Sequence, residues 1–364
     1  MIVTDESLRS SGVALTPQSF KTCPDWGATL RSISFRFSPV LSSPLAPLLR
    51  TPAFWSWNST ALICRDLTAI LIPIAAGRGV ALKEDARRMS EITAQYLLRT
   101  STITVSDVCC QGTCRRQSAE EYVAATQLVF PYRGVYVRHL GRDETVAEAN
   151  QVLFFNATEG YRVSHPVPGG DSSLVLFINE PLLQELTPAG LLDKGAPLAF
   201  RRQRLRIDPR AQALVALLRH SLQQNTADTL EAESLALTLV QRALGPRTTH
   251  TPGASGGRQR LADRAKLVLA GNPARRWTLA DIAAEMRCSP VYLTQVFQQV
   301  EGLPLYRYQL RLRLARALDL VAQYEDLTAL SLDLGFSSHS HFSAAFRETY
   351  GRSPSEFRQS ALPH

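Results

Sequence analysis

Long hydrophobic runs and cysteines are both scarce in this chain of 364 residues. The longest apolar run, LTAILIPIAAG from Leu67, has about half the length that a membrane helix needs. The six cysteines are too few for a small disulfide-stapled secreted fold. The first residues, MIVTDESLRSSG, lack the basic and apolar stretches of a secretory leader. We therefore expect a reducing, cytoplasmic location and no membrane partner.

Acidic residues and nucleotide-binding signatures are also in short supply. The 32 Asp+Glu are outnumbered by 40 Lys+Arg, which gives a formal charge of +8. This balance favours an acidic partner such as nucleic acid. No Walker loop and no dinucleotide-binding fingerprint is present, so we predict that the chain is not an enzyme and needs no cofactor. The 45% of apolar residues is enough for two or three domains with cores of their own.

The first two thirds of the chain change character twice. Residues 1–88 show no sustained hydrophobic period, so we predict an extension that is disordered, or not translated if the natural protein begins at Met89. From about Thr102 to Phe177 the pattern is that of strands separated by turn residues, as in a small sandwich or barrel. The runs are TITVSDV, QLVFPYRGVYVRHL, QVLFFNA, YRVSHPV and SLVLFI.

Two helices are predicted after the strands. DPRAQALVALLRHSL and DTLEAESLALTLVQRAL carry apolar residues three to four apart, and Asp228 is placed to cap the second helix. Two roles stay open for this second helix: a contact in a homodimer, or packing on its own β-rich domain. The polar segment 245–257, rich in Gly and Pro, predicts a linker.

The C-terminal region contains a repeated helical plan. TLADIAAEMRCSPVYLTQVF predicts a helix, a tight turn at Arg287 and a second helix capped by Ser289. DLTALSLDLGFSSHSHFSAAF repeats this plan, with Gly335 at the turn and Ser337 or Ser338 as the cap. The segment PLYRYQLRLRLARALDLVAQY predicts one long helix between the repeats. Two helix-turn-helix units are therefore expected.

The segment from about Arg260 to Arg358 resembles the DNA-binding domain of the AraC/XylS family of bacterial transcription regulators. The resemblance is carried by LADIAAEM, SPVYLTQVF, EGLPLYRYQLRLRLARAL, LGFSSHSHF, FRETYG and SPSEFR. It implies double-stranded DNA as the partner, RNA polymerase as a further one, and two recognition helices in successive major-groove segments. The positions that match the base-reading residues are Val291, Thr294, Gln295, His339, Ser340, Ser343 and Ala344, with Arg347 one turn further on for a phosphate.

Two departures from the family pattern concern these helices. Many members carry arginine where Gln295 and Ala344 stand in this chain. Because arginine is the side chain that most often reads guanine, we expect affinity to depend more on Gln295, His339 and backbone contacts.

The β-rich region resembles the cupin-like sensor domain that many of these regulators carry, through FPYRGVYVRHLG and VLFFNATEGYRVSHPVPGGD. The resemblance implies a small barrel with room for a small-molecule effector. A cupin enzyme fused to a DNA-binding domain is the less favoured alternative, because His139 and His165 are not part of an HxH motif followed by Glu and His. We predict that His165 is structural, at the start of the tight turn HPVPGGD, in which Asp171 bonds the backbone.

Three thiols lie close together in VCCQGTCRR, at Cys109, Cys110 and Cys114. Neighbouring arginines favour thiolates, so a soft-metal site or an oxidant sensor is an alternative function for the β-rich region. The spacing is not the CxxC of common zinc sites, and we predict no metal there. Reduced thiols at the end of a strand are the simpler interpretation.

The sequence as a whole predicts an α+β multidomain protein, with a β-rich cupin-like barrel and packed helices followed by an all-α double helix-turn-helix domain. The expected function is sequence-specific transcription regulation under effector control; the sequence does not decide between activation and repression. The predicted parts are an extension (1–88), a regulatory and dimerisation domain (89–244), a linker (245–257) and a DNA-binding domain (258–364).

Overall fold

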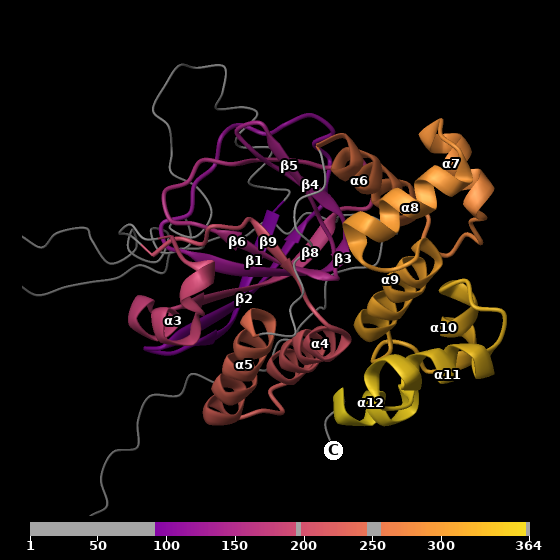
Figure 1. Ribbon diagram of the computed structural model, residues 1–364. Coiled ribbons are helices and arrows are strands. Elements are labelled where there is room, and N and C mark those ends of the chain that lie inside the picture. The colour runs from indigo at the N-terminus through magenta and orange to yellow at the C-terminus, as the bar shows by residue number, and fades with distance from the viewer. Residues whose placement is uncertain (1–91, 194–197, 246–255, 362–364) are drawn as a thin grey trace, which may run out of the picture. The chain divides into compact units, whose positions relative to one another are not determined.

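A computed structural model of the chain describes residues 92–193, 198–245 and 256–361 (Figure 1). All described residues belong to one compact unit, within Trp57–His364. The predictions made for residues 1–88 and for most of the linker lie outside the described residues. The division into the four predicted parts stays a prediction.

The described strands form two antiparallel sheets. Six strands pair in the order β1-β2-β8-β3-β6-β9, and three pair in the order β5-β4-β7. Every predicted strand run contains a strand, whereas β1, β5 and β9 were not predicted. Among the described residues neither sheet closes on itself, so the predicted cupin barrel is not confirmed. The strands are β1 Ile92–Arg99, β2 Ile103–Cys110, β3 Gln127–Gly134, β4 Tyr136–Leu140, β5 Asp143–Ala147, β6 Gln151–Phe155, β7 Arg162–Ser164, β8 Asp171–Ile178 and β9 Arg204–Arg206.

The helices follow the sheet-rich part of the chain, as predicted. Within the described ranges, no helix combines the length and the apolar character that crossing a membrane requires. The helices are α3 Glu180–Leu186, the 3-10 turn Ala189–Leu191, α4 Pro209–Gln223, α5 Thr229–Leu244, α6 Gly256–Gly271, α7 Leu279–Met286, α8 Pro290–Glu301, α9 Leu305–Leu320, α10 Leu327–Asp333, α11 His339–Tyr350 and α12 Pro354–Ala361.

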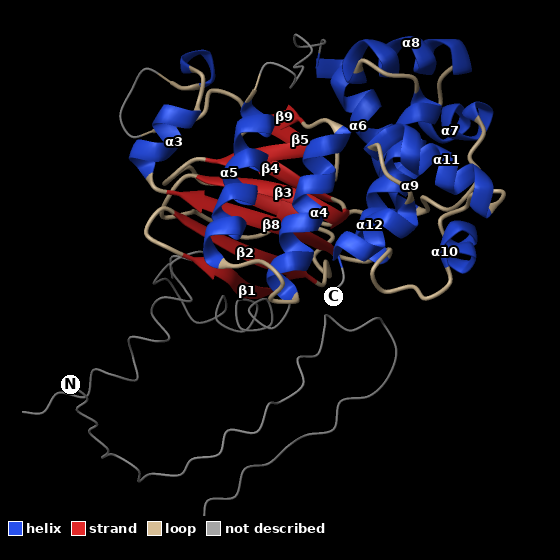
Figure 2. Ribbon diagram, turned by 90° about the horizontal axis from the view of Figure 1, so that it is seen from below, coloured by secondary structure: helices blue, strands red, loops and turns tan. Residues whose placement is uncertain are grey.

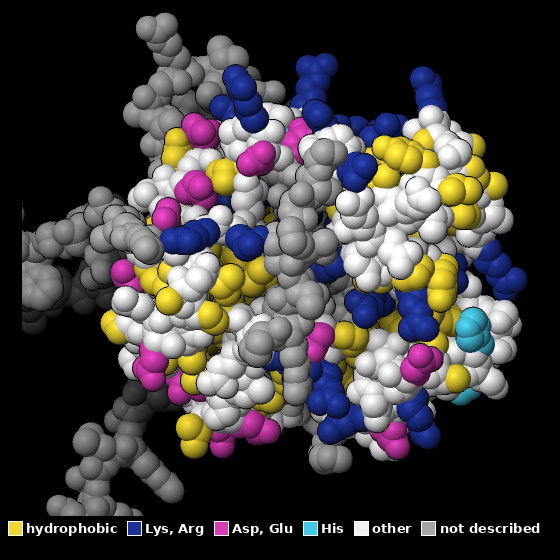
Figure 3. All heavy atoms as spheres, viewed as in Figure 1, with side chains coloured by type: hydrophobic (Ala, Val, Ile, Leu, Met, Phe, Trp, Pro, Cys, Tyr) yellow, Lys and Arg dark blue, Asp and Glu magenta, His cyan; other side chains and the backbone are white. Residues whose placement is uncertain are grey.

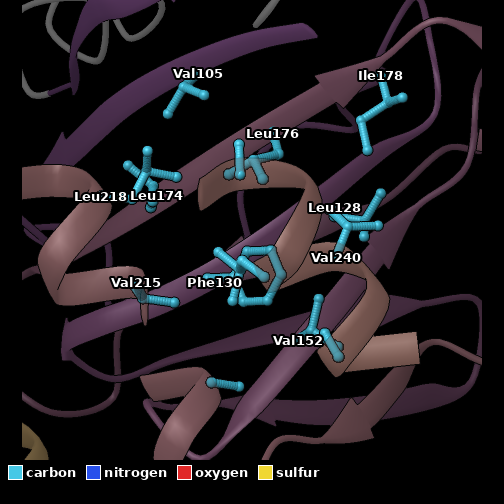
Figure 4. Close-up of a cluster of buried hydrophobic side chains, with 14 of the residues drawn as sticks. Val105, Leu128, Phe130, Val152, Leu174, Leu176, Ile178, Val215, Leu218 and Val240 are labelled. Carbon is cyan, nitrogen blue, oxygen red and sulfur yellow. The ribbon is translucent and has the colours of Figure 1, made fainter. Parts of the chain in front are cut away.

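Helices α4 and α5 cover one face of the six-stranded sheet (Figure 2). Alternate strand residues point to this face, because successive side chains of a strand lie on opposite sides. The shared core contains Leu128, Phe130 and Leu176 from the strands, with Leu218 and Val240 from the helices (Figure 4). Packing of α5 on its own sheet, one of its two predicted roles, is confirmed; a homodimer contact stays a prediction.

The opposite side of α4 packs against the C-terminal helices. Ala216 of α4 belongs to a core with residues of α9, α10, α11 and α12. Within this contact the buried carboxylate of Asp319 accepts a 2.7 Å hydrogen bond from Arg219, lies 3.5 Å from the guanidinium of Arg133, and is also paired with Arg316. The ring of His220 bonds the carbonyl of Leu318 at 3.1 Å. Helix α4 therefore contributes to the sheet core and to the C-terminal core at once.

The buried ring of His220 makes this contact sensitive to acid. Burial, and then the charge of Arg219, lower its pKa to about 4, whereas an unperturbed histidine has a pKa of about 6.5. Because the folded pKa is depressed, this contribution to stability is complete above about pH 6.5 and is lost as the pH falls towards 4. Between pH 7 and pH 5 we expect the free energy of unfolding to drop by about 2 kcal/mol more in the wild type than in His220→Gln. Urea unfolding at both pH values measures this, and equal drops in the two proteins would contradict it.

Candidate nucleic-acid interface

The first helix-turn-helix unit is fixed by local hydrogen bonds at its helix ends. Thr278 and Asp281 form a capping box at the start of α7. The helix ends at Arg287, whose φ of 55° turns the chain sharply. The hydroxyl of Ser289 then accepts a hydrogen bond from the backbone of Tyr292 and begins α8, with proline in the first turn. The turn and the cap predicted here are confirmed.

Helix α8 has a buried side and an exposed side. Leu293, Val296 and Phe297 are buried in a core with α6, α7 and α9. On the other side Val291 is 68% exposed and Gln295 is exposed, so both are available to a partner. Thr294 is half-buried, and its hydroxyl donates to the carbonyl of Pro290 at 3.0 Å. The methyl group of this threonine, more than its hydroxyl, is left for contacts outside the helix.

The second unit repeats this construction. Gly335 has a φ of 80°, and a Cβ added there would lie 2.1 Å from the carbonyl oxygen of Ala274, so a side chain does not fit at this turn. Ser338 accepts a hydrogen bond from the backbone of His341 and is the cap of α11. Of the two predicted cap positions, Ser338 is the one used. The ring of His341 lies outside the helix core, 3.3 Å from the hydroxyl of Ser337.

Helix α11 likewise separates a dry face from a polar one. Phe342 and Phe346 are fully buried, as predicted. The predicted contact residues lie on the opposite face: Ser340, Ala344 and Arg347 are exposed, whereas His339 and Ser343 are half-buried and 3.3 Å apart between Nε2 and Oγ. Both recognition helices therefore expose most of the predicted side chains, and what those side chains bind stays a prediction.

A residue missed by the sequence analysis joins the two units. The guanidinium of Arg313, on α9, donates to the carbonyl of Pro273 at 2.8 Å, to that of Arg275 at 2.9 Å and to that of Gly335 at 3.0 Å. These carbonyls belong to the loop before α7 and to the turn after α10. Nothing in the local sequence marks Arg313, because its partners are brought to it only by tertiary packing. The orientation of one unit relative to the other rests partly on this side chain.

Positive charge accompanies the exposed helices. On the face shown in Figure 3, dark-blue Lys and Arg side chains lie over the region of α7 to α12, with few acidic side chains among them. The side chain of Arg347 is 65% exposed, and its guanidinium is 3.9 Å from the Glu356 carboxylate. A separation of this length at an exposed site holds the guanidinium weakly, so a phosphate can compete for it.

A pocket opens in the β-rich region, between strands of the two sheets. The space in it that a water-sized molecule can occupy is about 100 Å³, and the pocket is partly open to solvent. Its wall is mostly apolar, with Val123, Phe155 and Val175 among the lining residues. The polar part of the wall contains Cys110, Cys114, His165 and Asp171, together with Glu121, Gln127 and Ser173. A small, largely apolar molecule that also carries polar groups matches this lining.

The polar part of the pocket is assembled by strand pairing. Cys110 of β2 stands directly opposite Asp171 of β8. The carboxylate of Asp171 lies 2.6 Å from Nε2 of His165, and Sγ of Cys114 lies 3.1 Å from Nδ1 of the same ring. Burial alone would lower the pKa of His165, but the bonds to Asp171 and to the thiols raise it well above its ordinary value. The backbone bond predicted for Asp171 is thus replaced by a bond to the buried ring of His165.

The structure separates the three predicted thiols. Cys109 neighbours Cys110 in β2, so its side chain lies on the other face of the sheet, where it accepts a hydrogen bond from Ser172. His139 bonds Ser164 at 2.8 Å and does not line the pocket with His165. Gly112, after β2, and Gly170, before β8, are the only hint in the sequence that these two loops approach each other closely. Which loops meet depends on the sheet register, which the sequence does not show.

Comparisons with known proteins agree on the C-terminal region. Residues 282–360 match a family model described as a helix-turn-helix domain. An AraC-like transcription regulator of Streptomyces antibioticus is 30% identical over 54% of this chain and 64% of its own length, so the alignment spans less than two thirds of that relative. The transcriptional regulator LumQ of Photobacterium leiognathi is 26% identical over 62% of this chain and 89% of its own length.

The chain is also similar to solved structures of transcription regulators. A transcriptional regulator with an AraC-type DNA-binding domain from Chromobacterium violaceum is 32% identical, and the match covers 30% of this chain and all of that one, with a TM-score of 0.28. ToxT from Vibrio cholerae is 13% identical over 76% of this chain and all of its own, with a TM-score of 0.30. Both TM-scores are below 0.5, so neither likeness bears on the fold of this chain.

Proposed function

We propose that this chain, whose C-terminal region is a helix-turn-helix domain of the AraC type, reads a specific DNA sequence with α8 and α11 in two successive major-groove segments. The observation that carries this proposal is the repeated construction of the two units. In each, a tight turn and a serine cap lead into a helix with one buried apolar face and one exposed polar face. An α-helix of this kind fits the major groove of B-DNA.

The exposed side chains suggest how bases are read. The amide of Gln295 can bond adenine through two hydrogen bonds, and the methyl groups of Val291, Thr294 and Ala344 suit thymine methyls. His339, Ser340 and Ser343 supply hydrogen bonds in the second helix, and Arg347 supplies a phosphate contact. The proposed base-reading positions contain neither arginine nor lysine. We therefore expect two sequence blocks in which A·T pairs are read more strongly than guanine.

Control by an effector is proposed through contacts between the β-rich region and the recognition helices. Glu301, the last residue of α8, is paired with Arg206 of β9 at 3.1 Å and with Lys266 of α6 at 2.6 Å. Asp319 of α9 is held by Arg219 of α4, which also packs on the sheet. A molecule that shifts the strands around the pocket would change these contacts and with them the placement of the recognition helices. A homodimer and RNA polymerase are the further partners that we propose.

Selection of bound duplexes from a random DNA library, at physiological salt, tests the DNA-reading function. We expect an enriched site with two short blocks about one helical turn apart. Gln295→Ala should relax one block and His339→Ala the other, each by about 1 to 3 kcal/mol of discrimination where a base contact is lost. Gln359→Ala, at an exposed position of α12, is the matched control and should leave both blocks unchanged. Binding without any enriched motif, vanishing as salt rises, would overturn sequence-specific reading.

A further inference from the structure

The pocket wall brings together three side chains of the kind that bind metal ions. Cys110, His165 and Asp171 each offer one potential ligand atom, and these three atoms lie within 4.8 Å of one another. The Sγ atom of Cys114 is 3.1 Å from Nδ1 of His165. Thiolate sulfur and imidazole nitrogen are the ligands that zinc and softer metal ions prefer. We propose that Cys110, Cys114 and His165 form a binding site for a zinc-like metal ion, which none of the related proteins' names indicates.

Asp171 is positioned as the carboxylate that hydrogen-bonds the second ring nitrogen of a metal-bound histidine. Its Oδ1 is 2.6 Å from Nε2 of His165, which leaves the other ring nitrogen, Nδ1, towards Cys114. A carboxylate in this position keeps a proton on Nε2, orients the ring and makes Nδ1 a stronger ligand. A metal ion bound there takes the place of the proton between the ring and the thiol sulfur. Asp171 is thus a supporting residue, and the three direct ligands are the two sulfurs and Nδ1.

The backbone holds these groups close together. The N–H of His165 donates to the carbonyl of Cys114 at 2.7 Å, which ties the loop after β2 to the segment after β7. Gly112 has a φ of 67°, and a Cβ added there would lie 2.6 Å from Cα of Gly170 and 3.1 Å from the ring of His165. Only glycine allows this approach, because any side chain at position 112 would push the two loops apart. The glycine between the cysteines is therefore part of the site.

Three protein ligands are the arrangement of zinc sites that keep one coordination position for another molecule. The remaining wall of the pocket is mostly apolar, with Val123, Phe155 and Val163 among its residues. A small molecule with an apolar body and an anionic or amine donor would therefore fill the pocket and reach the metal ion. Apolar burial and one metal bond together would select such an effector.

Metal titration of the full chain, reduced and stripped with a chelator, tests the site. Cobalt(II) is the spectroscopic probe, and zinc(II) bound after desalting is counted by elemental analysis. We expect one ion for each chain at this site, with the near-ultraviolet absorption of a cobalt–thiolate bond. Asp171→Asn should weaken binding by about 10- to 100-fold. Cys110→Ser and Cys114→Ser should each weaken it more and reduce the thiolate band.

Cys109→Ser is the matched control, because Cys109 neighbours a ligand in sequence but lies on the other face of the sheet. It should bind cobalt as the wild type does. Circular dichroism of each variant checks the fold, and Cys114, half-buried in a loop, is the substitution least able to disturb it. Unchanged binding in both ligand-serine variants would overturn the proposal. The proposal would also be overturned if the reduced wild type bound no ion and the protein as first purified carried a Cys110–Cys114 disulfide. DNA is absent from this test, so the outcome is independent of the proposed regulatory function.

Discussion

Replacing Asp319 with alanine is expected to destabilise the folded protein by about 3 to 5 kcal/mol. The side chain is 1% exposed and is surrounded by the guanidinium groups of Arg219, Arg133 and Arg316. Burial alone would raise the pKa of this carboxyl, but the three arginines, Arg219 first, hold it below its ordinary value. Removing the carboxylate leaves buried positive charge without a counter-charge, and such a charge is costly in a low-dielectric interior.

Urea unfolding followed by circular dichroism measures this loss. Asp143→Asn is the matched control, since Asp143 is exposed at the start of β5, and it should shift stability by less than about 0.5 kcal/mol. The double variant Arg219→Met with Asp319→Leu should recover much of the loss, because it removes both charges and keeps the volume apolar. A loss in Asp319→Ala no larger than in the control would show that the arginines find other partners.

Asp319 and His220 both stabilise the fold less as the pH falls, but Asp319 loses its contribution at a lower pH than His220. Because the folded pKa of Asp319 is depressed, its contribution is complete above the unfolded value of about 4 and is lost as the pH falls further. The contribution of His220 is already lost between about pH 6.5 and 4. Acid should therefore loosen the contact between α4 and α9 in two stages, the histidine first and the carboxylate second.

Phe346→Ala is expected to cost about 3 to 5 kcal/mol of folding free energy. The ring is fully buried at the centre of an aromatic group, with ring centroids 5.7 Å from Phe342, 4.7 Å from Tyr350 and 5.9 Å from Phe357. Truncation removes the apolar surface of the ring and leaves a cavity between α11 and α12. Since α11 carries the second set of proposed DNA contacts, the second block of the selected site should weaken together with stability.

Glu348→Ala, two residues along the same helix and exposed, is the control for Phe346→Ala. It should change the free energy of unfolding by less than about 0.5 kcal/mol, because alanine is a good helix former and no buried contact is lost. Urea midpoints of both variants, with the slope of the transition checked for constancy, give the comparison. Equal midpoints in the two variants would mean that the aromatic group repacks around the cavity.

Local sequence patterns predicted the helix-turn-helix units in detail. Ser289 and Ser338 cap their helices because a serine oxygen can satisfy a backbone N–H that the first turn leaves unpaired. The phenylalanines of α11 are buried and its serines are not, as the three-to-four spacing of apolar residues requires. Signals of this kind span a few residues, so the printed sequence contains them completely.

Local sequence patterns could not predict which residues far apart in the chain meet in the fold. Cys110 meets Asp171 only through the register of β2 with β8, and Arg313 meets its three carbonyls only once both helical units are packed. Strand register is set by burial of one face of the whole sheet, and not by the residues that happen to meet. For this reason the interpretation of His165 as merely structural did not anticipate that two thiols would face its ring.

The sequence by itself determined that a strand-rich region precedes a helical one, the caps of the proposed recognition helices and most of the side chains that those helices leave exposed, because each depends on patterns within a few residues along the chain. Tertiary structure decided which thiols join His165, how Asp319 ties α9 to α4 and Glu301 ties α8 to β9, and that the described strands form two open sheets. These depend on which buried faces pack together, and that choice is made by the whole chain at once.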